Sequence, residues 1–272
     1  VGGLAGCYAE LAHALDYPGA ILGLQAHESV PVTLEQLARE HLQHMRRFQP
    51  EGPYVLGGWS MGGVLAYEIA RQLELERQSV ALLIMIDSFA PRARLGWHSQ
   101  ASQDRALIAM MAAELGIDAD RTSAAAALAA GGPALLELLL DLGKQQRRLP
   151  TDFTLSELTE QLRVLRRNVT ALHHYRGAPY RGVAVLIKAA DNHERDPLLG
   201  WGRLQLQPQI ATAPGTHFTM VRAPQAQHLA RVLQPWISRT FLSAQRSAVT
   251  TVPGEPKTPA SNHAATTAIA IG

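Results

Sequence analysis

The chain has 272 residues, of which 47% are hydrophobic and 18% are charged, a composition typical of a globular domain. Its mean hydropathy is −0.04 and no apolar run has spanning length, so we expect no membrane-spanning segment. The formal net charge of only +2 argues against a nucleic acid or an anionic membrane surface as a partner. The single cysteine, Cys7, excludes an internal disulfide, and no signal peptide opens the chain, so we expect a cytoplasmic protein.

The first third of the chain alternates strand and helix patterns. Short apolar runs predict strands at residues 20–24, 54–57 and 80–86. Thr33 and Gln36 form a capping box that predicts a helix start, and apolar residues at helical spacing predict another helix over residues 64–73. The strand at 80–86 is apolar on both faces, as in a parallel sheet covered by helices. The sequence therefore predicts an α/β fold.

The middle of the chain, residues 92–174, has only helical patterns, including a second capping box at Thr154 and Glu157. Strand patterns return at residues 183–187 and 209–213, and a helix is predicted at 225–241. The middle is thus an all-helical insertion between two strands. We expect one domain over residues 1–243, followed by a disordered tail rich in Ala, Thr and Pro at 244–272.

The motif Gly58-Trp59-Ser60-Met61-Gly62 stands where a buried strand turns directly into a helix. This arrangement is typical of a nucleophile elbow, in which glycines on both sides of the serine leave room for a sharp backbone turn. The helix N-terminus also favours a negative charge that develops beside the serine. The alternative interpretation is a glycine-rich turn or phosphate loop. The strand before the motif and the helix after it favour Ser60 as a nucleophile.

A serine needs a base to take its proton, and in this kind of fold the base is a histidine that comes last along the chain. His217 fits, because it lies in the glycine-containing loop 214–218 directly after the last predicted strand. His41 and His44 lie one turn apart on a helix, but no third ligand accompanies them, and we expect a solvated face. His193 lies in a polar loop with acidic neighbours. We predict no metal site.

Two aspartates follow predicted strands and are candidates for the acid that orients the imidazole. Asp87 follows the strand at 80–86 immediately, and Asp191 comes shortly after the strand at 183–187. An unpaired aspartate at the end of a wholly apolar strand would cost desolvation free energy, so a partner such as His217 explains Asp87 more easily. A capping or turn role for Asp87 is the alternative.

Four segments together carry a family resemblance. They are GPYVLGGWSMGG at residues 52–63, IDSFAP at 86–91, GWG at 200–202 and GTHFTM at 215–220. In this order they resemble the thioesterase domain that ends nonribosomal peptide and hybrid polyketide synthases. The resemblance implies an α/β-hydrolase fold with a mostly parallel sheet and a helical lid at about 92–174. It also implies a triad of Ser60, Asp87 and His217.

The same resemblance implies the reaction. Ser60 would accept an acyl or peptidyl chain from the phosphopantetheine thioester of a carrier-protein domain, and water or a group of the chain would then release it by hydrolysis or macrocyclisation. The oxyanion hole would use the backbone N–H groups of Met61 and of the loop that begins at Val1. No cofactor is expected beyond the pantetheine arm that the carrier brings.

Three other functions stay open at this point. They are a lipase or general esterase, a free-standing proofreading thioesterase, and a non-catalytic binding protein on the same fold. The basic pairs Arg46-Arg47, Arg147-Arg148 and Arg166-Arg167 are candidates for docking an acidic carrier protein, although helix-surface arginines are usually only solvated.

The resemblance further implies that an apolar strand precedes Val1 and lies between the strands at 20–24 and 54–57. Without such a strand, two rows of backbone groups would stay unpaired in the interior of the sheet. We therefore expect the sequence to be a fragment of a longer synthase, unless another segment fills that place.

Overall fold

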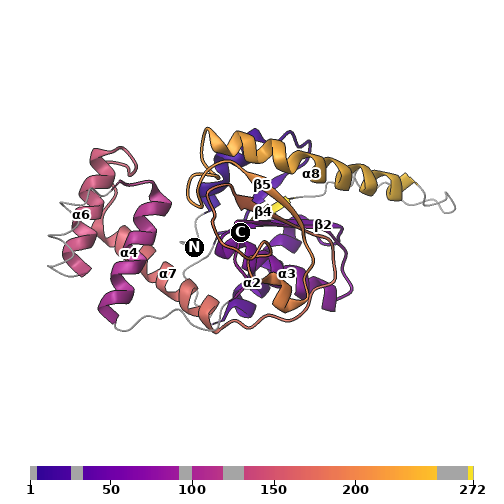
Figure 1. Cartoon of the computed structure of the whole chain (residues 1–272), viewed down its shortest axis with the longest axis horizontal. Coiled ribbons are helices and arrows are strands. Elements are labelled where there is room, and N and C mark those ends of the chain that lie inside the picture. The colour runs from indigo at the N-terminus through magenta and orange to yellow at the C-terminus, as the bar shows by residue number, and fades with distance from the viewer. Residues whose placement is uncertain (1–4, 26–32, 92–99, 119–131, 250–268, 272) are drawn as a thin grey trace. The chain divides into compact units, whose positions relative to one another are not determined.

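The computed structural model describes residues 5–25, 33–91, 100–118, 132–249 and 269–271. The chain forms two compact units. One unit contains the parallel sheet and is built from residues 5–25, 34–91 and the segment from 177 onward. The other is helical and centres on residues 92–176 (Figure 1).

The sheet has six parallel strands in the order β1-β6-β2-β3-β4-β5. Their bounds in chain order are β1 Ile21–Gly23, β2 Tyr54–Trp59, β3 Val80–Ile86, β4 Ala184–Ala189, β5 Gln209–Ala213 and β6 Ile269–Ile271. The first five confirm the strands predicted from the sequence to within two residues at each end. Every residue of β2 is buried, which is the expected pattern for a strand covered on both faces.

Helices cover both faces of the sheet, with α2 Leu34–Phe48 and α3 Met61–Leu75 on one side and α8 Gln225–Val249 on the other (Figure 1). The short helix α1 Ala9–Ala14 packs against α8, and the preceding turn η1 Ala5–Tyr8 contacts α1 and β1. Alternate strand residues such as Val55, Ile84 and Val185 share a core cluster with Leu229 and Leu233 of α8. This period-2 alternation assigns one set of strand side chains to each helical layer.

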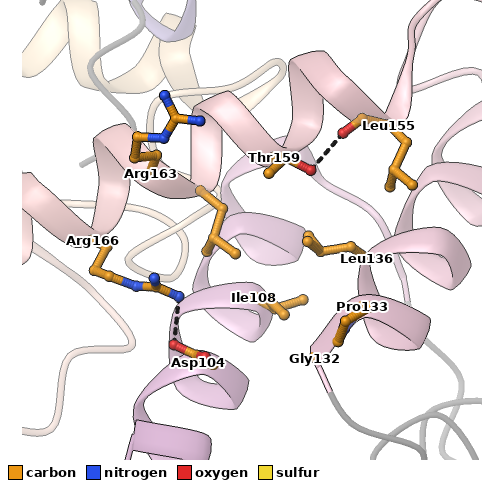
Figure 2. A pocket seen from close by; sticks show the side chains of 10 residues that line it. Asp104, Ile108, Gly132, Pro133, Leu136, Leu155, Thr159, Arg163 and Arg166 are labelled. Atoms are coloured by element: carbon orange, nitrogen blue, oxygen red, sulfur yellow. Dashed lines mark hydrogen bonds and ion pairs between the residues drawn. The ribbon is translucent and has the colours of Figure 1, made fainter.

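The helical unit contains α4 Gln100–Leu115, α6 Gly132–Gln145 and α7 Leu155–His174 among its described residues. Thr154 caps α7 in the predicted capping box with Glu157. The unit has its own apolar core and a pocket of about 340 Å³. Figure 2 shows this pocket, with Arg166 of α7 bonded to Asp104 of α4 at 2.6 Å. Helices therefore replace strands throughout the described part of this insertion, as predicted.

The prediction of a disordered tail from residue 244 is wrong for two segments. Helix α8 continues to Val249, and residues 269–271 form strand β6. Residues 250–268 lie outside the described part of the chain. The strand contains two β-branched residues, Ile269 and Ile271, which the average composition of the tail did not reveal. A strand between two neighbours with unpaired backbone groups can be this short.

Strand β6 occupies the place that the sequence left empty. β1 and β2 do not pair with each other, and β6 pairs in parallel with both of them. Ala270 lies opposite Leu22 on one side and Leu56 on the other. A segment from the far end of the chain thus satisfies backbone groups of the buried strand β2 that would otherwise have no partner.

We expect Ala270→Pro to destabilise the sheet unit, because proline removes a backbone N–H and does not fit an interior strand. Several buried backbone groups would lose partners at about 1 to 3 kcal/mol each, and the melting temperature should fall by roughly 10 °C. Ala270→Ser keeps the N–H and is the matched control. Thermal unfolding followed by circular dichroism measures both variants, and equal melting temperatures would contradict a contribution from β6.

Candidate active site

Ser60 occupies a strained turn between β2 and α3. Its backbone has φ 57° and ψ −123°, a conformation that L-residues adopt only under local constraint. A side chain at Gly58 would place its Cβ 2.1 Å from the carbonyl group of Gly62, so the turn requires glycine there. The Ser60 N–H donates to the carbonyl of Ile86 at 2.9 Å, which fixes the turn against β3. The local geometry is that of the predicted nucleophile elbow.

Asp87 directly follows β3 and is 1% exposed. Its Oδ2 lies 2.7 Å from Nδ1 of His217, while its Oδ1 accepts hydrogen bonds from the Ala189 N–H at 3.0 Å and from Asn192 Nδ2 at 2.7 Å. Burial alone would raise the pKa of Asp87, but the hydrogen bonds from these three groups outweigh it and hold the pKa below its ordinary value. The side chain is therefore a carboxylate near neutral pH.

His217 bridges the acid and the serine. Its Nε2 lies 3.1 Å from Ser60 Oγ, and its Nδ1 faces the Asp87 carboxylate. A carboxylate only accepts hydrogen bonds, so Nδ1 carries the proton and Nε2 is left with a lone pair toward the serine hydroxyl. The three side chains thus have the donor and acceptor order that a general base beside a nucleophile needs.

Trp59 holds the histidine loop in place. Its indole Nε1 donates to the backbone carbonyl of His217 at 2.8 Å, and its ring lies against the imidazole with centroids 5.1 Å apart. The indole is fixed in turn, because its residue is 3% exposed and its backbone N–H donates to the Tyr8 hydroxyl at 2.9 Å. The residue before the nucleophile therefore contacts the base directly. The spacing of the motif gave no signal for this contact.

Of the two predicted oxyanion donors, only Met61 lies within the described residues. Met61 is the first residue of α3, where the backbone N–H has no carbonyl four residues earlier within the helix to bond. Its amide is thus available in the place where an elbow uses one. Val1, the other predicted donor, lies outside the described residues.

The structure separates the other candidates from this site. Asp191 is exposed, and only its backbone N–H meets the histidine loop, at the Gly215 carbonyl. His41 is 3% exposed on α2, a helix that packs against α3, so the expectation of a solvated face was wrong for it. Over the described ranges, no three His, Cys, Asp or Glu residues gather as a metal site would require, and no helix is long and apolar enough to cross a bilayer.

Asn192 is a second residue of this site, besides Trp59, whose contact the sequence analysis missed. It was considered only as part of the polar loop after β4. Its signal was available in principle, because β4 neighbours β3 and the loops after adjacent parallel strands meet at one edge of the sheet.

Comparison with known proteins shows the family of the chain. The family model described as "Thioesterase domain" matches residues 1–237. Among curated relatives, a dimodular nonribosomal peptide synthase of Bacillus subtilis is 40% identical over 118 residues, covering 41% of this chain and 5% of that protein. Polyketide synthase PksR of the same species is 44% identical over 71 residues, covering 24% of this chain and 3% of that protein. The chain thus matches only a small part of these relatives.

Solved structures share the fold. The holo form of AB3403, a four-domain nonribosomal peptide synthetase bound to AMP and glycine, superposes with a TM-score of 0.73 and 26% identity, covering 93% of this chain and 19% of that one. The NocB thioesterase domain superposes with a TM-score of 0.60 and 24% identity, covering 88% and 91% of the two chains. These neighbours confirm the predicted α/β-hydrolase type of fold. Because the family match spans residues 1–237 of the 272, the chain belongs to the thioesterase domain family.

Proposed function

We propose that this chain is a serine thioesterase that releases an acyl or peptidyl chain from the phosphopantetheine thioester of a carrier-protein domain. The observation that carries the proposal is the continuous path of hydrogen bonds from Asp87 through His217 to Ser60 Oγ, with the serine on a strained elbow. Family membership supports hydrolysis of a thioester as the class of reaction.

In the first step, Ser60 Oγ attacks the thioester carbonyl carbon while His217 Nε2 takes the hydroxyl proton. The negative charge moves to the carbonyl oxygen, which the Met61 N–H at the start of α3 would stabilise together with the proposed loop at Val1. The intermediate then collapses. The C–S bond breaks, His217 returns its proton to the sulfur, and the products are an acyl-serine and the free pantetheine thiol.

In the second step, His217 removes a proton from the second nucleophile, which attacks the acyl-serine carbonyl. Water gives a free acid, and a hydroxyl or amine of the bound chain gives a macrocycle. His217 then protonates Ser60 Oγ as the ester C–O bond breaks, which restores the enzyme. Asp87 stays a carboxylate throughout and stabilises the imidazolium that forms twice in each cycle.

The proposed partner is a carrier domain of the same synthase, with the reaction taking place in the cytoplasm. Of the three basic pairs considered for docking, Arg46 is engaged with Glu76 and Arg166 with Asp104. Arg147 and Arg148 are both exposed just after α6, and we favour this pair as the basic site that docks the acidic carrier domain. The pantetheine arm arrives with the carrier and is substrate rather than cofactor.

A panel of acyl- and peptidyl-pantetheine thioesters tests the proposal, with the released products identified by mass spectrometry. We expect thioesters to be cleaved with higher kcat/KM than the matching oxygen esters. Better turnover of simple oxygen esters would instead indicate a general esterase, and preference for short acyl groups would indicate a proofreading enzyme. Failure to cleave any member, with no acyl-Ser60 detected, would favour a binding protein.

A further inference from the structure

We infer that Asn192 is a positioning residue of the triad, which holds the Asp87 carboxylate in the orientation that His217 needs. This inference rests on the proposed function of Ser60, Asp87 and His217. It adds a fourth side chain that acts through Asp87 and does not reach the serine.

The contact itself is short and directed. Asn192 Nδ2 donates to Oδ1 of Asp87 at 2.7 Å, and Oδ1 is the oxygen that does not face the histidine. The Ala189 N–H donates to the same oxygen at 3.0 Å. The last torsion angle of an aspartate side chain has only a broad preference, so hydrogen bonds to both oxygens help to fix the orientation of the carboxylate. With Oδ1 held by two donors, Oδ2 is left pointing at Nδ1 of His217.

The orientation of the Asn192 amide follows from its two partners. Its Oδ1 accepts from the Glu194 backbone N–H at 3.0 Å, and its Nδ2 faces the Asp87 carboxylate. A backbone N–H only donates and a carboxylate only accepts. A flipped amide would therefore place its NH₂ group against the Glu194 N–H and its oxygen against the Asp87 carboxylate. Asn192 is therefore a donor to Asp87.

The loop that carries Asn192 is itself fixed to the site. The Asn192 N–H donates to the Ala189 carbonyl at 3.0 Å, and the Asp191 N–H donates to the Gly215 carbonyl at 3.2 Å in the loop of the base. Asp191 was the second candidate for the acid, but the neighbouring residue, Asn192, is the one whose side chain contacts the site, and it does so as an amide. An amide adds a donor without adding a second negative charge beside Asp87.

The test measures phosphonylation of Ser60 by a fluorophosphonate in the full chain. Ser60 Oγ attacks phosphorus, the P–F bond breaks, fluoride leaves and the serine proton passes to His217, so the rate reports activation of the nucleophile. We expect Asn192→Ala to lower kinact by about 10-fold to 100-fold, the range for a lost hydrogen bond to a charged group. KI should stay unchanged, because Asn192 acts through Asp87. Asp191→Asn is the matched control, with a rate within about threefold of the parent.

The variant Asn192→Asp distinguishes two possible roles of Asn192, that of a hydrogen-bond donor and that of a side chain that only fills space. It keeps the shape of the side chain and the bond from Glu194, but it places an oxygen against Oδ1 of Asp87. A donor role predicts a slower reaction than for Asn192→Ala at pH 8, whereas a space-filling role predicts a faster one. In an Asp87→Asn background, Asn192→Ala should cost less than about threefold, because the group it positions is already lost. Thermal unfolding of each variant confirms that the compared proteins are folded.

Each remaining outcome decides one of the two claims. Asn192→Ala with the parent rate, Asn192→Asp faster than Asn192→Ala, or full additivity with Asp87→Asn would overturn the role of Asn192 and leave the triad intact. A parent chain that is not labelled at Ser60 would overturn the proposed function, and the role of Asn192 with it.

Discussion

Ser60→Ala should abolish acyl transfer while the fold is kept. The change removes only Oγ, and alanine retains the Cβ that the elbow already accommodates at φ 57°. Loss of the nucleophile should lower kcat by about 10⁴-fold to 10⁶-fold, since the acyl-serine cannot form and only the binding and oxyanion contacts of the site remain. Release of thiol from an acyl-pantetheine thioester measures the loss, and the melting temperature should stay within about 2 °C of the parent, as for a small change at a partly exposed site.

Ser88→Ala is the matched control for this prediction. Ser88 is a buried serine next to the triad whose Oγ has no hydrogen-bond partner among the described residues. Its removal should leave both turnover and fluorophosphonate labelling near the parent level. Labelling that persists in Ser60→Ala would place the nucleophile at another serine.

Asp87→Asn should cost about 10⁴-fold in kcat, the size of effect that follows when the acid of a triad becomes an amide. An asparagine at this position either turns an N–H group toward Nδ1–H of His217 or presents a neutral oxygen to it. The imidazole then loses the tautomer that keeps Nε2 free, or it loses the charge that stabilises the imidazolium. Steady-state kinetics with a pantetheine thioester at pH 8 measures the effect.

Asp191→Asn is the comparison that decides between the two candidate acids. Its carboxyl group is exposed, and its only described contact with the site is through the backbone. We expect a change within about threefold, as for a surface substitution away from the reacting groups. Equal losses in the two variants, or a larger loss at Asp191, would move the acid to the loop after β4.

The elements that the sequence predicted correctly are those whose cause is local. The elbow at Ser60 depends on glycines within two residues, and the strands β2 and β3 are marked by continuous apolar runs. The helix α7 begins at the capping box of Thr154 because both partners lie within one turn. Such features need no knowledge of the rest of the chain. They also suffice to name Ser60 and His217, since chain order limits where the base occurs.

Other features depended on how distant segments pair. The selection of Asp87 over Asp191 was favoured by a desolvation argument, but the contact was set by the pairing of β3 with β4 and by the loop after β5. The roles of Trp59 and Asn192 follow from contacts with residues 158 and 105 positions away, and such contacts leave no periodic pattern in a sequence.

Strand β6 gives the clearest case. The segment 269–271 is too short to be predicted as a strand from its sequence, and its composition led to the prediction of a disordered tail. Only the unpaired backbone edges of β1 and β2, brought together by the rest of the sheet, make that short segment a strand. The sequence by itself thus determined the fold class and singled out Ser60 and His217 as the candidate nucleophile and base, because these depend on neighbouring residues and chain order. The tertiary structure decided the acid's partners and the interior strand, because hydrogen bonds between distant segments form only once the sheet has assembled.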